Sequence, residues 1–172
     1  MELVGLNKIK FIAPYHTRLT ITTGIFNSIL IYCLPLFGGC TKEQTHELQV
    51  LQNRAAQIVT RKPPYSTRKH LYDITGWLTV SQLVVYHSLL MIYKIRKSRE
   101  PEYLAKFFLN ETRTGRIMEP CIKLGLAQKS FCIRGTSCWN TLPPSIRNST
   151  KLGEFKRKLK LWIIQNIPRF PD

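Results

Sequence analysis

An apolar stripe at helical spacing, preceded by a capping box, runs through residues 41–60 and constrains the fold more than any other feature. In Thr41-Lys-Glu-Gln44, the threonine and glutamine side chains are placed to satisfy the first free backbone N–H groups of a helix. The apolar residues after it fall on one face of a 3.6-residue helix: Leu48, Leu51, Ala55, Ile58 and Val59. The pattern predicts an amphipathic helix that stops before Pro63-Pro64.

The same periodicity recurs along the chain and predicts an all-α fold. Residues 15–34 form one predicted helix, and residues 68–76 form a short one closed by Gly76. A second capping box, Thr79-Val-Ser-Gln82, opens a helix to about Arg96 whose apolar face is wide enough for a bundle centre. Further helices are predicted near 101–108, at 129–139, and after a Ser149 or Thr150 cap.

Together these segments predict a helical bundle of about five to seven helices with a long loop near 109–128. We expect a helical segment over 1–62 and a basic helical segment over 63–172, packed as one unit. The core positions expected from spacing in the first and last helices are Leu19, Phe26, Ile29, Leu30, Cys33, Leu152, Phe155, Leu159, Trp162 and Ile163.

The charge of the chain points to a polyanionic partner. Its 172 residues carry 26 Lys and Arg against 10 Asp and Glu, a formal net charge of +16. Residues 1–60 hold five basic and three acidic side chains, so the remaining 21 basic and seven acidic residues leave +14 on 61–172. Nucleic-acid backbones and anionic lipid surfaces are the two usual partners of such a field. A basic surface without any partner is the alternative interpretation.

Basic and aromatic residues alternate in several places after residue 60. The loop Arg61–His70 holds two prolines that keep the backbone extended while its cations project, and it is the strongest candidate for phosphate contact. The full set of predicted nucleic-acid-binding residues is Arg61, Lys62, Arg68, Lys69, Lys94, Arg96, Lys97, Lys129, Arg134, Lys156, Arg157 and Lys160. The aromatic residues at helical core spacing are expected to pack inside rather than to stack on bases. They are Tyr86, Tyr93, Trp139, Phe155 and Trp162.

Residues for catalysis are scarce in the sequence. Asp73 and Asp172 are its two aspartates, so the clustered carboxylates of two-metal nucleotidyl transfer cannot be assembled. The sequence also lacks phosphate-binding glycine loops and a zinc-protease motif. We therefore expect no enzyme activity, no cofactor, no metal and no small-molecule substrate.

Cysteine usage and hydropathy bear on the compartment. The five cysteines form no CxxC pair, which favours reduced thiols in a nuclear or cytoplasmic protein. The stretch between Arg18 and Lys42 carries no charge and is long enough to span a bilayer, but its polar content favours a buried helix over a membrane span.

Several strings in a fixed order resemble one family. They are Ile31-Tyr-Cys-Leu-Pro-Leu-Phe-Gly-Gly39, Leu48-Gln-Val-Leu-Gln-Asn-Arg-Ala-Ala-Gln-Ile-Val59, Gly76-Trp-Leu-Thr-Val80, Lys129-Ser-Phe131, Trp139-Asn-Thr-Leu-Pro143 with Ile146-Arg147, and Phe155-Lys156. This set resembles the region downstream of the palm in reverse transcriptases of non-LTR (LINE-type, jockey-like) retrotransposons. The similarity covers about residues 6–166, and its two longest strings are the most specific.

The resemblance implies a thumb-like segment over 1–62 and a C-terminal segment that grips template RNA and target DNA without sequence specificity. The paired-aspartate polymerase motif of the family, its endonuclease, and the Cys/His knuckle of some relatives are not found in the sequence. Binding is then the property expected to survive, with nucleic acid and the polymerase palm as partners. Two alternatives remain: a helical protein–protein interaction module without nucleic-acid affinity, and a membrane-associated basic protein binding through 19–38.

Overall fold

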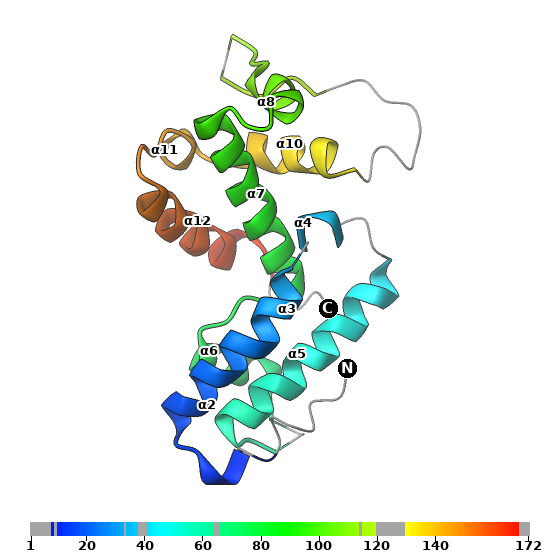
Figure 1. Ribbon diagram of the computed structural model, residues 1–172, viewed down its shortest axis with the longest axis vertical. Helices are drawn as coiled ribbons and strands as arrows, with labels where there is room; N and C mark the ends of the chain where they lie inside the picture. The colour runs from blue at the N-terminus through cyan, green and yellow to red at the C-terminus, as the bar shows by residue number, and fades with distance from the viewer. Residues whose placement is uncertain are drawn as a thin grey trace. The chain divides into compact units, whose positions relative to one another are not determined.

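The described parts of the chain are mostly helical, as the computed structural model in Figure 1 shows. The structure describes residues 8, 10–32, 34–37, 41–63, 66–113, 115–119 and 130–168. Over these residues it contains no strand, only an isolated antiparallel bridge between Glu111 and Ile117. The predicted all-α class is confirmed.

The chain divides into two compact units. The N-terminal unit comprises Met1–Tyr32, Cys40–Ser81 and Arg169–Asp172, and the C-terminal unit comprises Cys33–Gly39 and Gln82–Pro168. One boundary between the two units falls just inside a helix, at residues 81–82. The segments expected over 1–62 and 63–172 stay a prediction.

The N-terminal unit contains α2 (Tyr15–Thr22), the π-helical segment η1 (Thr23–Asn27), α3 (Ser28–Ile31), α5 (Lys42–Thr60) and α6 (Arg68–Thr75). The long helix α5 lies beside α2, and α6 packs on α5 (Figure 1).

The predicted capping box at the start of α5 is formed. The Gln44 N–H donates to Thr41 Oγ1 at 3.3 Å, and the Thr41 N–H donates to Gln44 Oε1 at 3.0 Å. The helix ends at Thr60, after which Arg61 takes a left-handed conformation with φ 57°. Both the start and the stop of this helix follow the prediction.

The predicted helix at 15–34 differs from the structure in two ways. The helical segment ends at Ile31. Pro35, which we expected to lie beyond the helix, is instead part of the short helix α4 (Leu34–Phe37). The π-helical segment η1 has more residues per turn than an α-helix, and the consecutive residues Phe26 and Asn27 are both buried there. Expected core residue Ile29 is consequently 52% exposed. Cys33, another expected core residue, lies outside the described residues.

A buried polar cluster explains why α6 belongs to the N-terminal unit. The Tyr72 hydroxyl from α6 donates to Oε1 of Gln52 or Oδ1 of Asn53, both at 2.9 Å. The fully buried Gln52 also donates from Nε2 to the carbonyl oxygen of Leu78 at 2.9 Å. The Val80 N–H donates to Gln49 Oε1 at 2.9 Å. These bonds tie residues 68–80 to α5, a connection that sequence spacing does not reveal.

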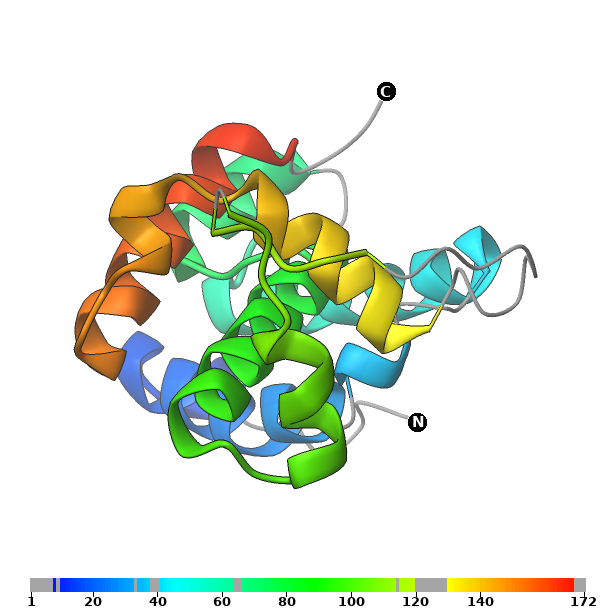
Figure 2. The ribbon, with the colours of Figure 1, turned by 90° about the horizontal axis from the view of Figure 1, so that it is seen from above.

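The C-terminal unit contains α4, α7 (Val80–Ser98, from Gln82 on), α8 (Glu102–Leu109), α10 (Phe131–Thr141), α11 (Pro144–Arg147) and α12 (Leu152–Asn166). Figure 2 shows α10 leading through α11 into α12. The helices predicted at 101–108 and 129–139 are confirmed within about two residues, the usual uncertainty of helix ends. Much of the loop predicted near 109–128, from residue 120 onward, lies outside the described residues.

Three stacked aromatic rings form the centre of this unit. Tyr93 of α7 stacks on Phe155 of α12 with ring centroids 4.2 Å apart and an interplanar angle of 17°. Trp139 of α10 lies against the same phenylalanine, 6.0 Å between centroids. All three side chains are buried, so the expectation that they pack inside is confirmed.

The start of α12 was predicted incorrectly. Its N-cap is Lys151, with no side-chain cap hydrogen bond, rather than Ser149 or Thr150. The carbonyl oxygens of those two residues instead accept from the Tyr93 hydroxyl, at 3.0 Å each. The bonds to Tyr93 hold the two carbonyls against α7, and the helix begins one residue later. Leu152, an expected core residue at the first position of this helix, is exposed.

Candidate nucleic-acid interface

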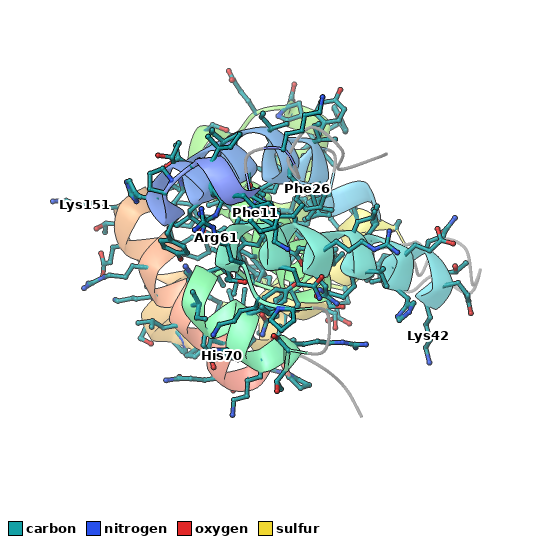
Figure 3. All side chains as sticks on the ribbon, turned by 90° about the horizontal axis from the view of Figure 1, so that it is seen from below. Phe11, Phe26, Lys42, Arg61, His70 and Lys151 are labelled. Carbon is teal, nitrogen blue, oxygen red and sulfur yellow. The ribbon has the colours of Figure 1, made fainter. Side chains whose placement is uncertain are left out.

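The predicted binding residues fall into two groups, those that hold backbone carbonyls and those that face solvent. Arg61 belongs to the first group. Its guanidinium donates to the carbonyl oxygens of Lys10 at 2.7 Å, Phe11 at 2.9 Å and Ala13 at 3.1 Å. Figure 3 shows Arg61 and Phe11 close together. The left-handed backbone at the end of α5 turns the side chain toward this segment.

Arg96 and Arg134 also hold parts of the fold together. Arg96 forms an ion pair with Glu111, donates to the carbonyl oxygen of Phe108, and places its guanidinium 5.3 Å from the ring centroid of Trp139. Arg134 donates from Nη2 to the carbonyl oxygen of Pro35 at 3.0 Å.

Two arginines outside the predicted set make the same kind of contact. Arg18 is buried and donates twice to the carbonyl oxygen of Val59, at 3.0 and 2.8 Å. Arg147 donates to the carbonyl oxygen of Gly115 at 2.8 Å. Guanidinium groups suit this role because they offer several donors in a fixed planar fork.

The rest of the Arg61–His70 segment is exposed where it is described. Lys62, Arg68, Lys69 and His70 are all exposed, and the last three form the first turn of α6. That turn carries no acidic residue, so positive side chains surround the positive end of the helix dipole. His70 can be followed on α6 in Figure 3. The region is thus positively charged and accessible, although Arg61 itself binds carbonyls.

The predicted lysines of α7 and α12 face solvent in the C-terminal unit. Lys94, Lys97, Lys156, Arg157 and Lys160 are all exposed. Lys97 places its ammonium 5.9 Å from the ring centroid of Tyr93. Lys129, the last predicted residue, lies outside the described residues.

The carboxylate of α12 pairs with a lysine outside the predicted set. Lys158 Nζ lies 2.6 Å from Glu154 Oε1. The hydrogen bond from Lys158 and the charge of that ammonium lower the pKa of Glu154 below its ordinary value. Among the described residues no carboxylate pairs with Lys94 or Lys156, so their charge remains available to an external anion.

His87 is a candidate residue that the sequence did not single out. It is half-buried on α7, with its ring edge-on to Tyr86 at 5.2 Å between centroids. Burial lowers the pKa of His87, and the positive charges of Lys94 and Lys156 lower it further. The spacing of seven residues between His87 and Lys94, two turns on one helix face, was the available signal.

Rings available for stacking on bases lie away from the aromatic core. The most exposed aromatic side chains described are Phe11, Tyr32 and Tyr103, with exposed fractions of 78%, 76% and 73%. Lys10 Nζ lies 5.5 Å from the ring centroid of Phe11, which combines a cation with a stacking surface.

The described residues contain no group of three or more His, Cys, Asp or Glu side chains positioned to hold a metal ion. No single helix among them is both long and apolar enough to cross a membrane, whereas α6 and α7 pass that test together as a bent pair.

Comparison of the chain with protein-family models, curated proteins and solved structures gives no match. The resemblance to non-LTR reverse transcriptases therefore depends on the ordered sequence strings alone.

Proposed function

We propose that the chain binds nucleic acid without sequence specificity and without catalysis, as a C-terminal fragment of a non-LTR retrotransposon reverse transcriptase. The observation that carries the binding proposal is the exposed basic surface of α7 and α12, where Lys94 and Lys156 have no carboxylate partner among the described residues. The proposed nucleic-acid partners are template RNA and target DNA, and the proposed protein partner is the polymerase palm. The ordered strings shared with the family supply the origin.

Backbone phosphates fit this surface better than base edges do. Lysine is a compact point charge on a flexible stem, which neutralises phosphate without reading sequence. Of the predicted arginines, Arg61, Arg96 and Arg134 already bind carbonyls of the fold, so fewer planar guanidinium groups are left for bidentate contacts with bases. Arg157 is the exposed arginine of α12 and stands among lysines. Binding is therefore expected to respond strongly to salt and weakly to sequence.

The test is the affinity of the whole chain for single-stranded oligouridine, measured by fluorescence anisotropy between about 50 and 200 mM salt. Each phosphate contact to a single strand contributes about 0.7 to the slope of log affinity against log salt, so about five contacts predict a loss of about 100-fold. A flat response overturns the proposal.

A matched pair of variants locates the surface. Lys156→Gln combined with Lys160→Gln should reduce the salt slope by about 1.4 if both lysines contact phosphate. Lys106→Gln is the control, because Lys106 is exposed but already lies 2.8 Å from Glu102. The control removes one charge and the double variant two, so a control effect about half that of the double variant would show that net charge, and not this surface, governs binding.

A protein–protein interaction module is the second candidate, favoured by an apolar stripe on the N-terminal unit. Ile25 and Ile29 are each 52% exposed and follow one another at the four-residue spacing of a helix face, with Tyr32 three residues further. This candidate predicts self-association that Ile25→Lys abolishes, together with no salt-dependent affinity for RNA.

A further inference from the structure

The α7–α12 pair is held in a fixed geometry by Tyr93. The ring of Tyr93 stacks on Phe155 at 4.2 Å between centroids, and its hydroxyl donates to the carbonyl oxygens of Ser149 and Thr150 at 3.0 Å each. A ring stack and two hydrogen bonds at one side chain restrict sliding and rotation of the helices against each other.

This geometry positions two lysines on neighbouring helices. Lys94 directly follows Tyr93, and Lys156 directly follows Phe155, so the backbone of each lysine is fixed next to one of the stacked residues. His87 lies two turns before Lys94, a distance of about 10 Å along the helix axis. Side chains on a helix lean toward its N-terminus, which directs Lys94 back toward His87.

Acidic side chains do not compensate this cluster. The helix α7 contains no Asp or Glu, and the acid of α12, Glu154, pairs with Lys158. The charged groups that act on His87 are Lys94 from its own helix and Lys156 from α12, and Tyr86 contributes a neutral ring. The charges of Lys94 and Lys156 both act on His87, and the one carboxylate of α7 and α12 is paired with Lys158.

We propose that His87, Lys94 and Lys156 form a binding site for a backbone phosphate of nucleic acid, and that His87 takes up a proton when the phosphate binds. This inference deepens the proposed function and rests on it. Even a neutral imidazole offers one N–H donor, so the ring can contact a phosphate oxygen before it is protonated.

Proton uptake follows from the charges around His87 in the free protein. Burial and the two ammonium groups lower the pKa of His87, so the free protein carries a neutral imidazole near neutral pH. A phosphate adds negative charge beside the ring and raises the pKa of His87. By reciprocity, affinity for nucleic acid increases as pH falls, approaching about tenfold for each unit by which binding raises that pKa.

The direct test follows the His87 ring by NMR from about pH 8 to about pH 5, a range that brackets the ordinary histidine pKa of about 6.5, in the free chain and with saturating oligouridine. The signal is assigned by its loss in His87→Gln. We expect the pKa of His87 to rise by about one unit in the complex. An unchanged pKa in a complex that still shows salt-dependent binding overturns this inference alone. Loss of all salt-dependent binding overturns the proposed function, and is detected without any measurement at His87.

Two kinds of variant test the geometry and the linkage separately. In the free protein, Lys94→Gln and Lys156→Gln should each raise the pKa of His87, because each removes a neighbouring positive charge. If neither variant changes the pKa of His87, the three groups do not form one phosphate-binding site. His87→Gln should remove most of the pH dependence of affinity between about pH 7.5 and 5.5 while keeping the salt slope. Full pH dependence in this variant contradicts the inference.

Discussion

Arg18 and Arg61 donate to the same carbonyl oxygen, that of Ala13. Arg18 reaches it from α2, and Arg61 reaches it from the residue that follows α5. Since Arg18 also donates twice to the Val59 carbonyl, the end of α5 is tied to the start of α2 by hydrogen bonds that involve no carboxylate. Burial lowers the pKa of Arg18, and the neighbouring charge of Arg61 lowers it further.

Arg18→Met should lower the free energy of unfolding by about 3 kcal/mol. The change removes three hydrogen bonds to a charged donor and leaves buried carbonyl groups short of partners. Denaturation in urea followed by circular dichroism measures the effect. Lys62→Met is the control, because Lys62 is exposed. If the two variants are equally stable, the contacts of Arg18 contribute nothing.

Gly135→Ala in α10 should destabilise the C-terminal unit by about 1–2 kcal/mol. A Cβ at this position would lie 2.7 Å from Ile92 Cδ1, and overpacking of this kind outweighs the better helix propensity of alanine. Gly153→Ala in α12 is the matched control. No atom lies within 4 Å of its added Cβ, so this variant should gain up to about 1 kcal/mol.

Ile92→Val removes the Cδ1 methyl group that the new Cβ would meet. A double-mutant cycle should therefore show that Gly135→Ala costs at least about 1 kcal/mol less in the Ile92→Val background. Additive effects would place the strain of Gly135→Ala elsewhere.

Tyr72 should make the N-terminal unit sensitive to alkali. Burial raises the pKa of its hydroxyl well above the ordinary value of about 10. The folded state therefore keeps a proton that the unfolded chain releases, and this contribution to stability is complete below about pH 10 and is lost as pH rises beyond it. Comparing the wild type with Tyr72→Phe isolates the contribution of this hydroxyl. Above about pH 10, the thermal unfolding temperature of the wild type should fall more steeply with pH than that of the variant. Parallel declines contradict the prediction.

Tyr93→Phe should lower the free energy of unfolding by about 1–2 kcal/mol while the ring stack persists. The variant loses one hydroxyl donor shared by the carbonyl oxygens of Ser149 and Thr150. Tyr86→Phe on the same helix is the control, since Tyr86 is only half-buried. Equal losses in the two variants would mean that the bonds of Tyr93 are not stabilising.

Local signals in the sequence predicted the helices well. The capping box at Thr41 and the helix end at Gly76 act within a few residues, so the sequence around them is sufficient. The prediction was wrong at Ile29, where a π segment changes which residues face the core. It was also wrong at Leu152, the first residue of α12, although Phe155 and Leu159 of the same stripe are buried.

The candidate site was less predictable, because charge alone does not identify a partner. Arg61 and Lys62 are neighbours in a basic loop and both are exposed, yet the guanidinium of Arg61 donates to three carbonyl groups of the fold. The carbonyl groups bound by Arg61 lie about fifty positions earlier in the chain, beyond the reach of any pattern of spacing. For His87 the spacing to Lys94 was a local signal, whereas the influence of Lys156 comes from another helix and could not be predicted from spacing.

The contacts that arginines make with main-chain oxygens give the protein two chemically separable populations of positive charge. An acylating reagent specific for amines should neutralise outward-facing groups such as Lys94 and Lys156 and abolish polyanion affinity while the helices persist. A dicarbonyl reagent specific for guanidinium groups should react slowly with Arg18, because this side chain is buried until the chain opens. The rate at which Arg18 is labelled should therefore report how often the N-terminal unit unfolds.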